Sequence, residues 1–558
     1  VTGVQTCALP ISSDELAVTK LPIWLADNVL HGTLANVRSA VRIAPGTPTR
    51  MQMGYDFSDT EVRFIRTMPP ITRANGYATI EGQTYTMVLS KGVVTPPIGG
   101  KIDMAGSVFS VLDITKKPAQ AEVRLKTRSS LTAALSILDE PPFRFLTKAN
   151  RPVEIGQGEA TLDAVLRFPL IPKIMPGDVS FAVNGRIAGF TSALLVKDKV
   201  VAAPDLSVSA DPKGLRIAGQ GTVGRLPFDV TFWQPFGPEA AGKARIEGVA
   251  ELSPLAVSEF NLGLPAGMID GTGQAQITID LPKGAPPRLA LVSDLNRIAM
   301  AIPGTGWSKP ADVQGRLELD AVLAQPPVVE NLTLSAPSLQ AKGRVSLRRD
   351  GGLDEARFDA VTIGDWFAGG VQITGRGQGK TVAVALTSGT VDIRKMADGA
   401  GASGGETGTD IPITTTLDEV RISDDLRLTA FRGSFTPRGG FNGSFDGLVN
   451  GIAAVSGTVV PAANGSAVRI RSDNAGAVLD SAGVFASARG GALDMLLTPQ
   501  EKAGVYTGSA LITKVRVANA PVLAELLSAV SVVGLLANLV AIPWVSFVVT
   551  PLAMLGVI

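Results

Sequence analysis

The sequence predicts a mainly β protein: an elongated, repetitive antiparallel sheet curled into an apolar groove, with few short helices and an apolar helix at its C-terminal end. Two observations predict this fold. Apolar and polar residues alternate in short runs along the chain, as they do in strands with one buried face. The 558 residues also include 61 Gly and 37 Pro but only 5% aromatic residues, so turn-formers are plentiful and large core side chains are scarce.

The overall composition favours a folded chain that does not bind nucleic acid. Hydrophobic residues make up 45% of the sequence. A chain of this kind can bury enough apolar surface to offset the entropy lost on ordering, so it folds, binds lipid, or does both. Lys and Arg number 51 against 50 Asp and Glu, a net charge of +1, and this balance produces no field that would attract nucleic acid.

The first eleven residues differ in character from the rest. Residues 1–11 (VTGVQTCALPI) resemble the translation of a sequencing adapter, so they are excluded from the fold prediction, and we expect the natural N-terminus to lie further upstream. The only cysteine, Cys7, lies in this segment. Disulfides and Cys-ligated metals are therefore excluded for the remaining chain.

Strands are predicted from end to end by strict alternation. Gly- or Asp-containing breaks, such as residues 350–352 and 375–379, separate the runs and suit hairpin connections between antiparallel neighbours. The clearest alternating runs are residues 121–126, 274–281, 316–321, 426–430 and 467–471.

Helical signals are few. Ser130–Asp139 predicts one short helix, which Pro141 and Pro142 terminate. Residues 398–410 (DGAGASGGETGTD) contain no side chain larger than Glu and predict a flexible linker. The expected order is therefore a β-repeat groove region at 12–397, the Gly-rich linker at 398–410, a second β region at 411–520 and an apolar helical tail at 521–558.

A sheet whose strands are apolar on one face must cover that face with another layer, close into a barrel, or curl around something apolar. Lipid acyl chains would fit a curled trough, whereas two stacked β-sandwiches would need no ligand. The alternating pattern alone does not distinguish a lipid-filled trough from a pair of stacked sandwiches. The candidate lipid-facing residues are Val123, Leu125, Ile277, Ile279, Leu317 and Leu319, and each could instead pack beneath another protein layer.

Three segments resemble one known family. Trp24–Asn28 with Leu34–Val37, Gly306–Pro310 and, most specifically, Asn519–Leu536 resemble the AsmA-like superfamily in its large YhdP-type branch. This resemblance spans residues 20–540. It implies a periplasmic protein, anchored in the inner membrane of a Gram-negative bacterium, whose β repeats form a long groove. It also implies phospholipid as the cargo and the inner membrane, with outer-membrane components, as partners.

Two short segments match catalytic or phosphate-binding motifs only in part. Gly401–Gly405 matches G-x-S-x-G, but it lacks the preceding strand, the following helix and a later His, because the only histidine is His31. Gly379-Lys380-Thr381 resembles the end of a phosphate-binding loop, but Thr374 stands where that motif needs its first glycine. The sequence therefore predicts no enzyme, no cofactor and no metal site.

Two functions are consistent with the sequence. The leading hypothesis is a lipid-binding and transport scaffold, in which acyl chains lie on the apolar face of a curved sheet. The alternative is an assembly or secretion factor that binds outer-membrane or adhesin clients by strand addition. Material that stays bound after gentle purification, phospholipid or β-rich client protein, would discriminate between them.

The C-terminal tail is uncharged from Leu526 to Ile558, which exceeds the roughly 20 apolar residues needed to cross a bilayer. Pro543 and Pro551 interrupt it. We expect a genuine helix at Pro521–Leu539 and a frame-shifted or misassembled end after about Val540.

Overall fold

The computed structural model describes residues 28–517, apart from residues 43–49, 66, 172–173, 241–242, 265–266, 303–304, 350–351, 378–379, 396–410, 437–441, 464 and 502–504. Internal contacts divide the chain into two compact units, Val1–Gly248 and Val249–Ile558. The prediction of a mainly β protein is confirmed, because 28 of the described strands belong to one large sheet and only short helices accompany them. The adapter-like segment, the linker at 398–410 and the helix at Pro521–Leu539 lie outside the described residues.

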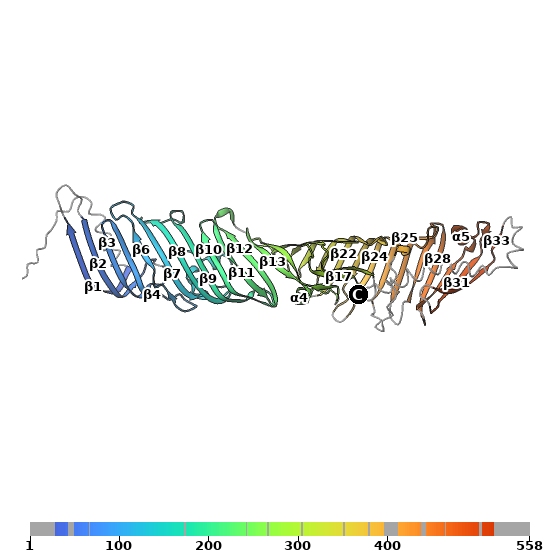
Figure 1. The fold of residues 1–558 in the computed structure, drawn as a ribbon, viewed down its shortest axis with the longest axis horizontal. Helices are drawn as coiled ribbons and strands as arrows, with labels where there is room; N and C mark the ends of the chain where they lie inside the picture. The colour runs from blue at the N-terminus through green and yellow to red at the C-terminus, as the bar shows by residue number, and fades with distance from the viewer. Residues whose placement is uncertain are drawn as a thin grey trace, which may run out of the picture. The chain divides into compact units, whose positions relative to one another are not determined.

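Unit 1 is an antiparallel meander. Its strands lie side by side in chain order (Figure 1), and each long strand pairs with the strand that precedes or follows it. The short strand β5 departs from this order, since it pairs with both β4 and β7. The strands are β1 Val29–Arg42, β2 Arg50–Val62, β3 Ile71–Glu81, β4 Thr84–Val94, β5 Ile102–Asp103, β6 Val108–Val111, β7 Gln120–Ser130, β8 Gln157–Pro169, β9 Ser180–Val196, β10 Lys199–Asp211, β11 Gly214–Val223, β12 Leu226–Pro235 and β13 Ala244–Leu252, the last of which contains the division between the units.

The helix predicted at Ser130–Asp139 is confirmed as α2, Leu131–Leu138. Ser130 is its N-cap, because its Oγ accepts a hydrogen bond of 3.0 Å from the backbone N–H of Ala133. The same hydroxyl donates to the carbonyl of Gly99, which ties the helix start to the preceding loop. The other helices in the described part of the chain are α3 Phe145–Lys148, α4 Pro254–Glu259 and α5 Ala475–Ser481, with 3₁₀ turns η1 Pro176–Asp178, η2 Pro238–Ala240 and η3 Ile393–Lys395.

Unit 2 continues the antiparallel pattern with one exception. β24 and β25 pair in parallel, with Val384 opposite Ile413. A parallel pair needs a crossover connection rather than a tight hairpin, and the chain from Asp392 to Ile413 is long enough to supply one. The strands are β14 Ile269–Gly271, β15 Gly273–Leu281, β16 Arg288–Ser293, β17 Ile298–Ile302, β18 Trp307–Lys309, β19 Arg316–Val322, β20 Val328–Ala336, β21 Leu339–Leu347, β22 Leu353–Ile363, β23 Phe367–Thr374, β24 Ala383–Asp392, β25 Ile413–Arg421, β26 Arg427–Thr436, β27 Asn442–Val449, β28 Ala453–Ala462, β29 Gly465–Ser472, β30 Ala488–Arg489, β31 Ala492–Pro499, β32 Tyr506–Thr513 and β33 Arg516–Val517.

The largest core lies in unit 2. Over most of β25, β28, β29 and β31 buried residues alternate with exposed or half-buried ones, as alternation predicts for strands packed on one face. Phe431 on β26 and Phe445 on β27 stack at the centre, with ring centroids 5.6 Å apart. The alternating runs predicted from sequence all fall within strands, except that Leu426 precedes β26.

A small separate sheet accompanies the main one in unit 2. It contains β14, β17 and β18, and the sequence analysis did not foresee it. Trp307 on β18 is buried, and its indole Nε1 donates a 2.8 Å hydrogen bond to the carbonyl of Pro337. Met300 and Ile302 on β17 pack against the large core. These contacts fix the small sheet to the main sheet within this unit.

Candidate functional site

An apolar face runs across four neighbouring strands of unit 2. The strand registers place Ile277 on β15 opposite Leu291 on β16, Leu291 opposite Leu319 on β19, and Leu319 opposite Leu332 on β20. We call this set of four side chains the Ile277 row. Ile277 and Leu319, two of the predicted lipid-facing residues, therefore share one row.

Two more of the predicted residues flank the Ile277 row. Ile279 lies two residues along β15 and is opposite Leu289, and Leu317 lies two residues along β19 and is opposite Leu334. Since residues two apart in a strand point to the same face, all four predicted residues of unit 2 share that face. The sequence analysis did not identify their partners on β16 and β20, although apolar and polar residues alternate in those strands too.

The four predicted residues of this face are only half-buried. Ile277, Ile279, Leu317 and Leu319 are all intermediate in exposure, and none belongs to a buried core cluster. In a two-layer sandwich such residues would face a second sheet and be excluded from water. Leu334 on this face packs against the large core. The Ile277 row, by contrast, belongs to no buried cluster within the described residues.

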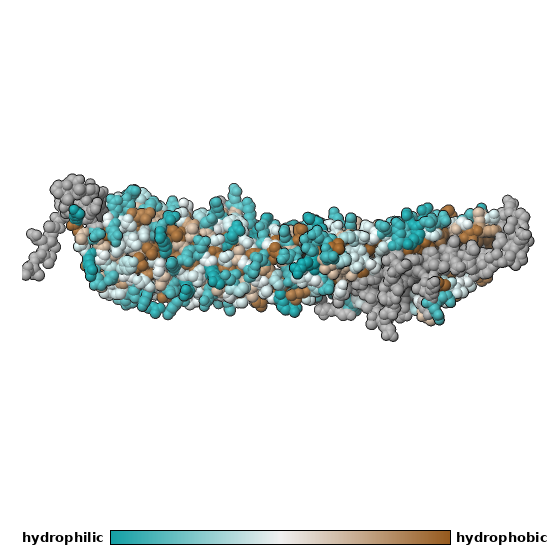
Figure 2. Space-filling model, viewed as in Figure 1, coloured by the Kyte–Doolittle hydropathy of each residue, from teal (hydrophilic) through white to brown (hydrophobic). Residues whose placement is uncertain are grey.

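The two remaining predicted residues, Val123 and Leu125, lie in unit 1 on β7. Val123 is opposite Phe109 on β6 and Leu166 on β8, and Leu166 is in turn opposite Phe181 on β9. All four side chains of this row are half-buried. Figure 2 shows one face of the molecule, on which apolar residues lie among polar ones across this unit.

A pocket lined only by apolar side chains lies in unit 2 between the strands from β26 to β31 and α5. Its cavity volume is about 50 Å³. Sequence analysis missed it, because its walls combine side chains spread from Ile422 to Met495. The lining residues are Ile422, Leu426, Leu428, Phe445, Val449, Val455, Ile470, Val478, Leu479, Ala482, Leu493 and Met495.

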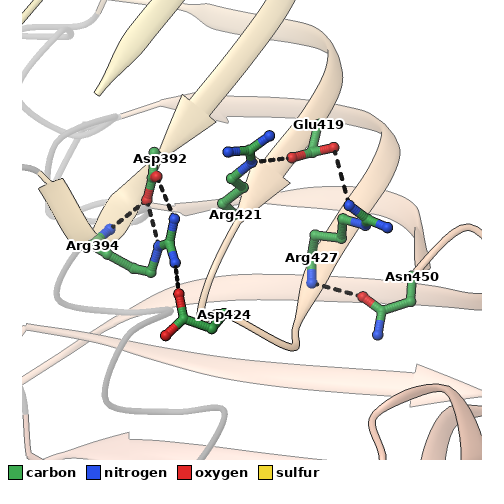
Figure 3. Close-up of polar contacts among 7 residues, drawn as sticks. All are labelled: Asp392, Arg394, Glu419, Arg421, Asp424, Arg427 and Asn450. Carbon is green, nitrogen blue, oxygen red and sulfur yellow. Dashed lines mark hydrogen bonds and ion pairs between the residues drawn. The ribbon is translucent and has the colours of Figure 1, made fainter. Parts of the chain in front are cut away.

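Charged groups gather where β24 and β25 end and β26 begins (Figure 3). Arg394 donates to both carboxylate oxygens of Asp392, at 2.8 and 2.6 Å, and also contacts Asp424. The hydrogen bonds from Arg394 hold the pKa of Asp392 below its usual value. Glu419 bridges Arg421 and Arg427, two cations that lie directly opposite each other on β25 and β26.

Asn450 connects this polar edge to α5. Its side-chain oxygen accepts from the backbone N–H of Arg427 at 2.9 Å (Figure 3). Its amide nitrogen donates to the carbonyls of Asp425, at 2.7 Å, and Ser481, at 2.6 Å. Ser481 is the last residue of α5, so this side chain holds the helix beside the pocket.

Comparison with known proteins gives one partial match. A family model described as Competence protein matches residues 480–558. The match covers less than half of the chain, and it includes Asn519–Leu536, so it does not assign that segment to the AsmA-like superfamily. No curated protein and no solved structure matches the chain.

Metal-binding and membrane-spanning features are both missing from the described residues. No three His, Cys, Asp or Glu side chains within them are grouped closely enough to hold a metal ion. None of the helices within them has both the length and the apolar character needed to span a bilayer.

Proposed function

We propose that this protein is a lipid-binding scaffold of the Gram-negative cell envelope that carries phospholipid between the inner and outer membranes along apolar faces of its sheet. The half-buried Ile277 row carries the proposal, since it offers aliphatic surface that a sandwich core would bury. The periplasmic location and the inner-membrane anchor rest on the AsmA-like resemblance alone.

Burial of hydrocarbon would supply the binding energy. Each methylene removed from water contributes about 0.8 kcal/mol, so an acyl chain needs a continuous aliphatic surface rather than specific polar contacts. The cross-strand rows in each unit supply such surface. The apolar pocket beside α5 is a second place for hydrocarbon, because no polar side chain lines it. This mode of binding requires no catalytic group.

The test introduces two negative charges into the apolar face. Leu317→Asp combined with Leu319→Asp should lower co-purifying phospholipid by about tenfold, because a loss of about 1.4 kcal/mol in binding free energy corresponds to that factor. Lipid is extracted from the purified full chain and quantified per mole of protein by mass spectrometry.

The matched control is Gln274→Glu combined with Gln276→Glu. These two residues are exposed on β15, on the face opposite Ile277, so the control adds the same two negative charges away from the apolar face. Control protein should retain its lipid. Equal lipid content in a correctly folded Leu317→Asp, Leu319→Asp protein would refute the proposal.

A further inference from the structure

The floor of the pocket beside α5 lies on the same face of the sheet as the Ile277 row. Residues directly opposite each other on neighbouring strands point to one face, and the registers from β20 onward extend the row from Leu332 to Phe445, Ile470 and Met495, which line the pocket. The other members of this succession are Gly343, Phe358, Val371, Leu386, Thr415, Gly433 and Gly457. All of them except Thr415 are apolar residues or glycines, so the pocket belongs to one long apolar face.

The pocket suits hydrocarbon and nothing polar. Only apolar side chains line it, and it is partly open, with a cavity volume of about 50 Å³. An apolar cavity gives water no hydrogen-bond partners, so it stays dry and binds small apolar groups instead. A cavity of about 150 Å³ holds the six carbons of benzene, so a third of that volume suits about two carbons. This is room for the end of a hydrocarbon chain and not for a whole chain.

α5 forms a fixed roof over this cavity, and it packs against β28 (Figure 1). Hydrogen bonds hold both of its ends. The backbone N–H of Ala475 donates to the carbonyl of Gly491 at 2.8 Å, and Asn450 Nδ2 donates to the carbonyl of Ser481 at 2.6 Å. The lining residues from the helix and its C-terminal cap are Val478, Leu479 and Ala482. Because the roof is held at both ends, the cavity has a defined size.

We propose that this pocket seats the terminal methyl end of a hydrocarbon chain and thereby selects the length of the chain that the protein binds. The inference rests on the proposed lipid-binding function. The last carbons of the chain fill the cavity, and the remaining carbons lie on the apolar side chains at its open side. Binding therefore strengthens with each added carbon until the cavity is full, and then strengthens no further.

The experiment uses the purified full chain, freed of its own lipid, and a series of saturated fatty acids with even numbers of carbons. Affinity is measured by displacement of a fluorescent fatty acid. Each added pair of carbons should strengthen binding by about tenfold until the cavity is full. The chain length at which this gain stops is the length limit of the protein.

Two substitutions in the lining should move the length limit in opposite directions. Ala482→Val adds two carbons to the wall, so the limit should fall by about two carbons. Leu493→Ala removes three carbons from the wall, so the limit should rise. The matched controls are Ala510→Val and Leu339→Ala, at residues that pack in the large core but do not line the pocket. Both controls should keep the limit of the unchanged protein.

An unchanged limit in a correctly folded Ala482→Val protein identifies the cavity as an empty packing defect and overturns the inference. Equal shifts in the controls also overturn it. If Leu493→Ala does not fold, Ala482→Val decides alone, because it fills space without removing a contact. Fatty acids that bind without any change in the limit leave the lipid-binding proposal standing, whereas a protein that binds none of them contradicts both.

Discussion

The ammonium nitrogen of Lys309 lies 2.6 Å from the carbonyl oxygen of Ile298. It also donates to the carbonyls of Leu295, Pro310 and Val313, all within 3.1 Å, and the side chain is only 2% exposed. Burial lowers the pKa of this ammonium. One buried cation therefore satisfies the backbone of the loops around β17 and β18, which explains a lysine in an otherwise apolar setting.

Lys309→Met should destabilise the small sheet. Methionine is of similar length but cannot donate, so several buried carbonyls lose their hydrogen-bond donor at a cost of about 3 kcal/mol. Hydrogen exchange at β17 and β18 should accelerate by roughly a hundredfold. Lys342→Met, at an exposed position on β21, should leave this exchange unchanged. Unaltered protection in Lys309→Met would show that the carbonyls find other donors.

Glu122 should make the pairing of β7 and β8 sensitive to acid. It is buried and accepts hydrogen bonds from Arg124 at 2.7 Å and Arg167 at 2.8 Å, which lower its pKa. A carboxyl group with a lower pKa in the folded state stabilises the fold above its unfolded pKa, and this contribution is lost as pH falls through the folded value.

Exchange at β7 and β8, corrected for intrinsic rates, should therefore rise below about pH 4, where a free glutamate titrates. Glu122→Gln should remove this pH dependence, while Asp163→Asn, at an exposed position on β8, should retain it. A pH profile that is identical in the unchanged protein and in Glu122→Gln would contradict the prediction.

Gly457→Ala should disrupt the large core. A Cβ atom at this position on β28 would lie 2.0 Å from the Phe445 ring, so the ring must move, at a cost of about 1 to 3 kcal/mol. Gly447→Ala on β27 is the matched control, because the nearest atom to its Cβ would be 3.4 Å away. Thermal unfolding of unit 2 should shift for the first variant only.

Phe445→Leu should partly rescue Gly457→Ala, because leucine leaves the space that the added methyl group needs. A double-mutant cycle measures this coupling. Strict additivity of the two substitutions would refute the steric explanation.

Asn450→Ala should loosen α5. The substitution removes the donor to Asp425 and Ser481 and the acceptor for the Arg427 N–H. Exchange across Ala475–Ser481 should increase by about tenfold or more, since each lost hydrogen bond contributes about 1 kcal/mol. Asn331→Ala, exposed on β20, should have no such effect. Unchanged exchange would mean that the apolar contacts of α5 alone hold it in place.

The sequence by itself determined the local elements. Alternation placed the strands at 121–126, 274–281 and 316–321, and the helical run ended by Pro141 and Pro142 placed α2, because these signals depend only on neighbouring residues. The same alternation predicted that Ile277 and Leu319 lie on the apolar face of their strands.

Only the tertiary structure decided which strands meet and which faces stay open. The parallel pairing of β24 with β25 and the pocket beside α5 both join residues distant in sequence. The carbonyl shell around Lys309 is more local, but it depends on how the loops around β17 and β18 fold. The same alternation surrounds Leu319, which stays half-buried, and Val468, which is fully buried. Alternation specifies which side of a strand is apolar and not what covers that side. The pairing register and the packing between strands determine which apolar faces are covered.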